Sequence, residues 1–402
     1  MYNIRRITDK ISYIGCSNRK QEIFEAIYPI EKGVSFNSYF IDDEKTVIID
    51  TVDKSCAEQF YENVEKALNG RKLDYLFVQH MEPDHAALIK NICDKYPELK
   101  IVCTNKTVDM IKQFFGLDIS GNAMVVKEGD TLNTGSHEFT FVMAPMVHWP
   151  EVMVTYEKNN KILFSADAFG SFGAINGNLF DDEINFERDY LDEARRYYTN
   201  IVGQYGAQVQ MLLKKAAGLD IKMICPLHGV IVKENIGLFV EKYNNWSLYQ
   251  PEENSIMIAY SSVYGGTENA VNILAGALAD RGIKNIKIFD TSSTHHSYIL
   301  GEAFKASHIV IATTTYNAGI FETMDRVLNS FKKHNLQNRK YVIMQNGSWA
   351  IACGRQVREV IESIKNSEIL DESICIHSAL TEEQLEDINR VADLLVESVN
   401  QK

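Results

Sequence analysis

The 402-residue sequence has no long uncharged apolar run, and no stretch approaches the roughly 18 apolar residues that a membrane-spanning helix needs. Its N-terminal segment, MYNIRRITDKISYIG, lacks the apolar core and the small-residue cleavage site of a secretion signal. It also has no internal repeat and no low-complexity tract. These absences predict a folded cytoplasmic protein without a membrane partner.

The sequence contains no two cysteines close to each other. The seven cysteines are scattered and none forms a C-x-x-C pair, which argues against a disulfide framework, a zinc knuckle and a rubredoxin-type iron site. Most lie in apolar runs, such as Cys103 in KIVCTN and Cys225 in KMICPLHG. We therefore expect buried, reduced thiols.

An excess of positive charge is absent too. The net charge is −13, which argues against a nucleic-acid partner because such a partner requires a basic surface. Apolar residues make up 45% of the chain and charged residues 24%, as in an ordinary folded protein. At about 150 residues per domain, the length predicts two or three domains.

Two halves of different pattern meet near residue 250, where YNNWSLYQPEENSIMI has the composition of a linker. The first half presents many strand-like runs before its first long helical pair, so it is not a simple alternating α/β domain. The second half alternates five strands with helices, which predicts one doubly wound parallel sheet. We predict domains at residues 1–250 and 254–402.

The strongest motif is VQHMEPDH, whose last six residues, HMEPDH, directly follow the apolar run LDYLFVQ. It places His80, Glu82, Asp84 and His85 within six residues at a strand end. Such side chains cannot all be buried without partners, since unpaired buried charge is costly, and a metal ion would satisfy them. A solvated polar loop beside a capped helix is the alternative for so short a motif.

Three further ligand-type residues each follow a strand-like run: His148 after EFTFVMAPMV, Asp167 after KILFSA and His228 after MICP. Because strand ends converge on one edge of a sheet, we expect a single cluster. Four imidazoles and three carboxylates are too many for one tetrahedral zinc and suit two ions bridged by Asp167. Nitrogen and oxygen donors without thiolate favour iron or manganese, although zinc is compatible with the donor types. The remaining histidines are interpreted as surface or packing residues: His137, His295, His296, His308, His334 and His377.

A second candidate site begins where the run SIMIAY leads into SSVYGGTEN and a helix. Small and hydroxyl-bearing residues there let backbone N–H groups and the helix N-terminus surround a phosphate. The loop lacks G-x-G-x-x-G, which disfavours a Rossmann dinucleotide site, and a plain strand–helix turn is the alternative for one loop alone. The candidate residues are Ser261, Ser262, Val263, Tyr264, Gly265, Gly266 and Thr267.

Two later strand ends strengthen this site, because ligands of such sheets bind at the carboxyl ends of the strands near the switch point. Tyr316 and Trp349 are placed to flank a flat ring. The last loop is poor in glycine and is soon followed by Cys353. The candidate residues are Thr313, Thr314, Thr315, Tyr316, Asn317, Ala318 and Gly319 after one strand, and Asn346, Gly347, Ser348 and Trp349 after the next.

The first motif resembles the metallo-β-lactamase superfamily, whose hydrolases usually show His-x-His-x-Asp-His, but here Glu82 replaces the second histidine. His-x-Glu-x-Asp-His followed by His, Asp and His is similar to the pattern of flavodiiron proteins, also called A-type flavoproteins. The second half resembles a flavodoxin, so the likeness spans essentially the whole chain. It implies an α/β protein: an N-terminal metallo-β-lactamase-like αββα sandwich, then a flavodoxin-like doubly wound five-stranded parallel sheet.

The resemblance also implies the roles of the ligands. His80, Glu82 and His148 would bind one non-haem iron, Asp84 and His228 the other, with Asp167 bridging. His85 belongs to the motif but does not reach the metal in every member of that family. Tyr197 or Tyr198 is a candidate for a position behind the ligands, with a core aromatic as the alternative.

The function that the resemblance implies is gas reduction. FMN would take electrons from a separate rubredoxin or similar small carrier and relay them to two irons that reduce O2 to water, NO to N2O, or both. The working unit would be a head-to-tail homodimer, or a tetramer. One alternative is a di-zinc hydrolase fused to a flavodoxin module, which Glu82 argues against. Another is an electron carrier without metal chemistry, which the complete ligand set argues against.

Overall fold

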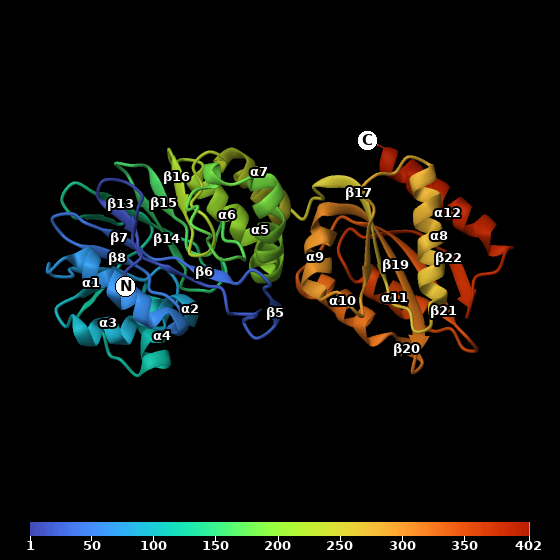
Figure 1. Ribbon diagram of the computed structural model, residues 1–402, viewed down its shortest axis with the longest axis horizontal. Coiled ribbons are helices and arrows are strands. Elements are labelled where there is room, and N and C mark those ends of the chain that lie inside the picture. Colours follow the sequence, from blue (N-terminus) through green and yellow to red (C-terminus); the bar gives the residue numbers. More distant parts are fainter. Residues whose placement is uncertain (402) are drawn as a thin grey trace. The chain divides into compact units, whose positions relative to one another are not determined.

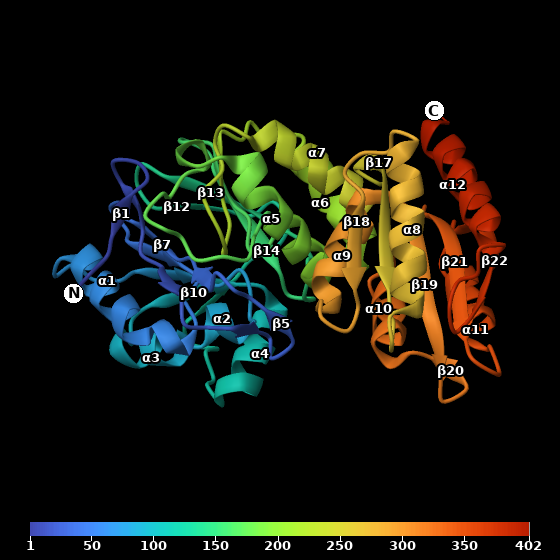
Figure 2. The ribbon, with the colours of Figure 1, turned by 45° about the vertical axis from the view of Figure 1, so that its right-hand side comes forward.

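The computed structural model describes residues 1–401, and the chain divides into two compact units (Figures 1 and 2). The N-terminal unit comprises Met1–Tyr198 and Tyr205–Asn244. The C-terminal unit comprises Thr199–Gln204 and the chain from residue 245 onward. A short segment ahead of the linker is therefore part of the C-terminal unit, which no sequence pattern indicated.

Two sheets face each other in the N-terminal unit and enclose its core. One side of the core is formed by residues such as Ile49 and Phe77, and the other by residues such as Phe141 and Phe164. The strand bounds, in sheet order, are β1 (Arg5–Arg6), β2 (Ile11–Tyr13), β7 (Tyr39–Ile41), β8 (Val47–Ile49), β9 (Tyr75–Phe77), β10 (Lys100–Cys103) and β11 (Ala123–Val125) in the first sheet. The second sheet contains β12 (Thr131–Asn133), β13 (Glu138–Met143), β14 (Met153–Glu157), β15 (Ile162–Phe164) and β16 (Met223–Cys225).

Both sheets are mixed. The strands from β8 to β11 run parallel, and β15 runs parallel to β16, whereas the other neighbours are antiparallel. Parallel neighbours bring their carboxyl ends to one edge, which places the loops after β9, β15 and β16 where a shared site can form. Two short ladders lie outside the sheets: β3 (Cys16–Asn18) with β6 (Val34–Phe36), and β4 (Ile23–Phe24) with β5 (Tyr28–Pro29).

Helices flank the sandwich, with α1, α3 and α4 beside the first sheet (Figure 1). In α1, Phe60, Val64 and Leu68 recur every fourth residue and are buried, as an amphipathic helix on a sheet requires. Among the described residues, no helix is both long and apolar enough to cross a membrane. The helix bounds are α1 (Ala57–Leu68), α2 (Pro83–Ala86), α3 (Ile89–Lys95), α4 (Asn105–Phe115), α5 (Leu191–Tyr197), α6 (Gly206–Ala216) and α7 (Ile236–Ser247).

The C-terminal unit is the doubly wound parallel sheet that the sequence predicts. Its strand order is β18-β17-β19-β21-β22, all parallel, and a short strand β20 pairs antiparallel with β19. The strands are β17 (Glu253–Tyr260), β18 (Lys287–Asp290), β19 (Ala306–Tyr316), β20 (Gly319–Ile320), β21 (Lys340–Gly347) and β22 (Glu368–His377). The helices are α8 (Gly266–Asp280), α9 (His296–Lys305), α10 (Glu322–Lys333), α11 (Cys353–Glu362) and α12 (Gln384–Asn400).

The expectation of reduced cysteines is wrong for two of them. Cys16 and Cys56 form a disulfide with their Cα atoms 6.4 Å apart, although 40 residues separate them in sequence. Cys16 starts β3, and Cys56 ends the 3-10 helix η1 (Lys54–Cys56), so the fold rather than local spacing brings them together. The other five, Cys93, Cys103, Cys225, Cys353 and Cys375, are free thiols.

Candidate functional site

All seven predicted metal ligands lie together at one edge of the sandwich, in loops that follow β9, β13, β15 and β16. They form two groups, and within each group one possible ligand atom per residue lies within 4.8 Å of all the others. The first group is His80, Glu82, His148 and Asp167, and the second is Asp84, His85 and His228. His85, whose role the motif left open, thus belongs to the cluster.

Asp167 faces both groups at once. Its Oδ2 lies 3.3 Å from Nε2 of His80 and 3.3 Å from Nε2 of His148. Its Oδ1 lies 3.2 Å from Nε2 of His85 and 3.7 Å from Nε2 of His228. One carboxylate oxygen is therefore presented to each group, as a bridging ligand requires.

Each group also has a carboxylate of its own. Glu82 Oε2 lies 3.0 Å from His148 Nε2 and 3.3 Å from His80 Nε2. Asp84 Oδ2 lies 3.1 Å from His228 Nε2 and 3.2 Å from His85 Nε2. The short helix α2 begins after Glu82 with Pro83 at its first position, and this turn directs Glu82 and Asp84 to different groups.

The donor set fits two cations. Both carboxylate oxygens of Asp84 and Oδ1 of Asp167 are buried without a hydrogen-bond partner. The Nε2 atoms of His85 and His228 lie only 3.0 Å apart. A bound cation satisfies these otherwise costly groups, and imidazole with carboxylate is a donor set suited to iron.

The doubly wound sheet of the C-terminal unit brings the other predicted loops together at the carboxyl ends of β17, β19 and β21. Ser261 Oγ and Thr313 Oγ1 are 2.7 Å apart, and Asn346 Nδ2 donates to Thr267 Oγ1 at 3.1 Å. A Cβ on Gly266 would lie 2.0 Å from the carbonyl oxygen of Ser378, so only glycine fits at the start of α8. This cradle of small residues at a helix N-terminus fits a phosphate.

Large aromatic side chains surround this cradle. Tyr264 is 99% exposed and Trp349 is 92% exposed, while Tyr316 is 46% exposed and contacts Phe321. Large exposed aromatic side chains in loops at one sheet edge are compatible with a binding site. Rings on neighbouring loops fit a flat aromatic ligand.

Known proteins resemble this chain in sequence and in fold. The model of the ODP family beta lactamase matches residues 34–229. The chain is 31% identical over 316 residues to the anaerobic nitric oxide reductase flavorubredoxin of Vibrio vulnificus, covering 77% of this chain and 63% of that one. It therefore spans less than two thirds of that relative's length.

Solved structures agree over the whole chain. The flavodiiron protein of Giardia intestinalis superposes with a TM-score of 0.92 at 24% identity, covering 99% of this chain and 98% of that one. The rubredoxin oxygen:oxidoreductase of Desulfovibrio gigas superposes with a TM-score of 0.89 at 26% identity, with the same coverage. This chain belongs to the flavodiiron protein family. The two predicted domain folds, metallo-β-lactamase-like and flavodoxin-like, are confirmed.

The electrostatics of this flavodiiron site keep its carboxylates charged. Burial alone would raise the pKa of Asp167, but His85 and His80 beside it hold that pKa well below its usual range. Burial alone would lower the pKa of His85. The nearby carboxylates of Asp84 and Asp167 outweigh burial and raise that pKa to about 10. Because cations and protons compete for these imidazoles, binding of a metal releases protons.

Contacts behind the ligands orient the histidines, and the sequence did not reveal them. Glu151 Oε1 accepts from Nδ1 of His80 at 2.9 Å, and the carbonyl oxygen of Ser35 accepts from Nδ1 of His228 at 2.7 Å. Each ring thereby turns its Nε2 toward the cluster. For Glu151, a signal was available: it is a glutamate at the start of the apolar run EVMVTY, three residues after His148.

Two further side chains approach the site. The ring of Tyr197 lies 5.4 Å from that of His228, and its buried hydroxyl has no hydrogen-bond partner. Tyr198, the other candidate, packs on Tyr243. Glu25, which the sequence did not single out, sits at the tip of the β4–β5 hairpin and hydrogen-bonds Glu82.

Proposed function

We propose that this flavodiiron oxidoreductase reduces dioxygen to water, nitric oxide to nitrous oxide, or both, with two non-haem iron ions and FMN as its cofactors. The main support for this proposal is that Asp167 presents one oxygen to each of two groups of imidazole and carboxylate donors. That arrangement supports a pair of ions rather than a single one. The glutamate at position 82 gives the first group an anionic donor, which stabilises oxidised iron.

The ligand roles that we propose follow the two groups. His80, Glu82 and His148 hold one iron, and Asp84 and His228 hold the other, with Asp167 between them. His85 is included with the second iron because its Nε2 is 3.2 Å from Asp84 Oδ2. When bound, the irons would supply electrons for reduction of the gas. Tyr197 directs its hydroxyl-bearing ring at the same edge and restricts the space beside His228.

The FMN-binding residues are proposed from the three loops of the C-terminal unit. Thr267 at the N-terminus of α8, with Ser262 and the backbone amides of Gly265 and Gly266, would hold the phosphate. The remaining predicted residues would contact the flavin ring and ribityl chain: Ser261, Val263, Tyr264, Thr313, Thr314, Thr315, Tyr316, Asn317, Ala318, Gly319, Asn346, Gly347, Ser348 and Trp349.

The partners are proposed from the relatives and from the exposed flavin loops. A rubredoxin-type carrier is the donor we favour, since the Desulfovibrio gigas relative is a rubredoxin oxygen:oxidoreductase. Exposed Tyr264 and Trp349 support a head-to-tail homodimer, because large apolar side chains beside a redox ligand favour a covering surface. We propose a cytoplasmic location for this assembly.

The decisive experiment compares the wild type with Asp84→Asn. The variant should retain its FMN absorbance but lose at least half of its iron and its gas reduction, because one group loses its own carboxylate. Asp74→Asn is the control, since Asp74 lies in the same unit and accepts a hydrogen bond from Thr46 N away from the cluster. Chemically reduced protein would be assayed anaerobically with each gas. Full activity in Asp84→Asn, or native occupancy by zinc alone, would refute the proposal.

A further inference from the structure

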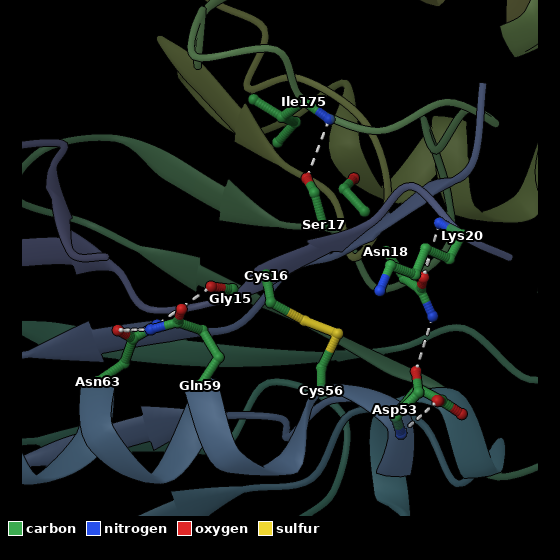
Figure 3. The surroundings of a disulfide bond; sticks show 12 residues. Gly15, Cys16, Ser17, Asn18, Lys20, Asp53, Cys56, Gln59, Asn63 and Ile175 are labelled. Atoms are coloured by element: carbon green, nitrogen blue, oxygen red, sulfur yellow. Dashed lines mark hydrogen bonds between the residues drawn. A yellow bond between two sulfur atoms is a disulfide. The ribbon is translucent and has the colours of Figure 1, made fainter. Parts of the chain in front are cut away.

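The Cys16–Cys56 disulfide joins two segments that lie directly behind the second metal group. Figure 3 shows the sulfur atoms linking β3, which contains Cys16 and Ser17, to the start of the helix that carries Gln59 and Asn63. Asn63 Nδ2 donates to the carbonyl oxygens of Ile14 and Gly15, which reinforces the same connection. The bond thus fixes β3 against the start of α1.

On the β3 side, the disulfide is connected to His228 through the neighbouring strand β6. In the β3–β6 ladder, Cys16 lies opposite Phe36 and Ser17 lies opposite Ser35. The carbonyl oxygen of Ser35 accepts from His228 Nδ1 at 2.7 Å, and Ser35 Oγ accepts from the amide of Gly229 at 2.7 Å. Strand β6 therefore holds the backbone and the ring of this histidine.

Phe36 extends the contact to the other histidine of the group. Its ring centroid lies 5.7 Å from that of His228 and 6.5 Å from that of His85, both in edge-on geometry. Because Phe36 pairs with Cys16, a shift of β3 is transmitted to a side chain that packs on both imidazoles.

On the Cys56 side, the disulfide is connected to His85 through Thr51, which lies just before η1 in the chain. The carbonyl oxygen of His85 accepts from Thr51 Oγ1 at 2.6 Å and from Thr51 N at 2.9 Å. From Thr51 the chain enters η1, which Asp53 caps and Cys56 ends. The two cysteines therefore anchor the two segments that hold His85 and His228, whereas His80 is held from another direction by Glu151.

The disulfide is largely buried, since Cys16 is 5% exposed and Cys56 is 8% exposed. It lines a cavity of about 930 Å³ together with Arg5, Arg19 and Lys20. The same lining contains Glu58 and Glu62, so the cavity is polar and suits a small dithiol, whose thiolate is the form that attacks a disulfide. Burial raises the pKa of the Cys93 thiol to about 11 and that of the Cys103 thiol to about 12, which makes these two thiols slow to attack a disulfide. The cavity therefore gives a small dithiol a route to the Cys16–Cys56 pair.

We propose that the Cys16–Cys56 pair is a reversible redox switch that controls how tightly the second metal group holds its ion. Exchange with a dithiol breaks the Cys16–Cys56 bond and leaves two thiols, while the dithiol loses two electrons and two protons and closes its own disulfide. The released β3 and η1 segments then hold His228 and His85 less firmly. The inference rests on the proposed metal function of this site.

The first test measures the state of the pair. Full-length protein carrying iron and FMN is equilibrated with oxidised or reduced dithiothreitol, denatured, alkylated and weighed by mass spectrometry. We expect alkylation of the five free cysteines in the oxidised sample and of two more, Cys16 and Cys56, in the reduced sample. Seven alkylated cysteines in both samples would overturn the proposal.

The second test measures metal retention in both states. Release of iron to ferrozine is followed anaerobically after reduction of the pair with a phosphine, and compared with the untreated protein. Loosening of contacts behind metal ligands weakens binding by about 10- to 100-fold, so the iron of the second group should leave at least about tenfold faster from the reduced form. Equal rates would refute the switch but leave the metal function standing. Absence of iron from both forms would refute the metal function itself.

Variants separate the pair from general effects of reductant. Cys16→Ser with Cys56→Ser should release iron rapidly with or without reductant, whereas Cys93→Ser should keep the wild-type response, because Cys93 is a free thiol in the same unit. A redox response that persists in the double variant would overturn the proposal. The comparison of the two wild-type states is independent of whether the double variant folds.

Discussion

Glu151 and His80 are joined by a 2.9 Å hydrogen bond between Oε1 and Nδ1, on the side of the imidazole away from Asp167. The amide of Met81 donates to the same oxygen at 2.8 Å, which fixes the carboxylate in place. Nδ1 of His80 therefore carries a proton, and its Nε2 is left to face the first metal group. A residue that touches no ion thus determines which nitrogen is available to one.

Replacing this carboxylate should weaken the first group. We expect Glu151→Gln to reduce iron retention by about tenfold, because the neutral amide no longer raises the basicity of His80. Iron per chain after dialysis against a chelator measures the effect. Glu157→Gln is a matched control, since Glu157 is also buried and bonds Nδ1 of His137 at 3.0 Å, away from the cluster. Equal iron loss in the two variants would contradict the assigned role.

The start of α8 offers a separate test of the flavin site. Gly266→Ala would place a methyl group 2.0 Å from the carbonyl oxygen of Ser378, so the loop must shift and FMN binding should fall by at least about tenfold. Iron content should not change. Gly276→Ala, in the same helix with no atom near its added methyl group, should bind FMN normally. Fluorescence titration of the flavin-free protein measures both, and normal FMN affinity in Gly266→Ala would be the contrary result.

Stability of the C-terminal unit should depend on pH through His308. Burial, with a contribution from Lys340, lowers the pKa of His308 to about 4, below the usual value of about 6.5. The unfolded chain then binds the proton more readily, so the unit loses stability as pH falls from about 6.5 toward 4 and keeps it above that window. His308→Gln should flatten this slope, and His377→Gln, at an exposed position, should not. Urea midpoints from circular dichroism at several pH values test this, and identical slopes for all three proteins would contradict it.

Reduction of the disulfide should also lower global stability. Closing a loop with a sequence separation of 40 restricts the unfolded chain by about 3 to 4 kcal/mol in the chain-entropy description. The N-terminal unit should therefore unfold at lower denaturant after reduction, and Cys93→Ser should show the same difference between its two states. An unchanged denaturant midpoint after reduction would contradict this prediction, because it would mean that the disulfide does not restrict the unfolded chain.

The sequence was most informative where chemistry and periodicity coincide. His80, Glu82, Asp84 and His85 follow an apolar strand directly, so ligand type and strand end could be read together. The parallel sheet of the C-terminal unit followed from its alternating pattern. Strands as short as β4 and β5, two residues each, leave no periodic signal, and the approach of Glu25 to the site could not be predicted.

Long-range contacts account for most of what the sequence could not reveal. Cys16 and Cys56 are paired because β3 and η1 meet in space, and nothing near either residue marks the other. Ser35 contributes only a backbone carbonyl to His228, which any residue provides. Ser378 limits the space at Gly266 in the same way, through its main chain. Backbone partners of this kind are set by topology rather than by side-chain identity.

The loop after β9 supplies donors to both groups from a segment of six residues, whereas His148, Asp167 and His228 arrive on separate loops. Loss or gain of a single residue between His80 and His85 would displace donors of both ions together. The separate loops can lengthen one at a time, provided that each returns its ligand to the same place. Among descendants of this chain, insertions should therefore accumulate around the three lone ligands, while the length of the HMEPDH segment stays fixed.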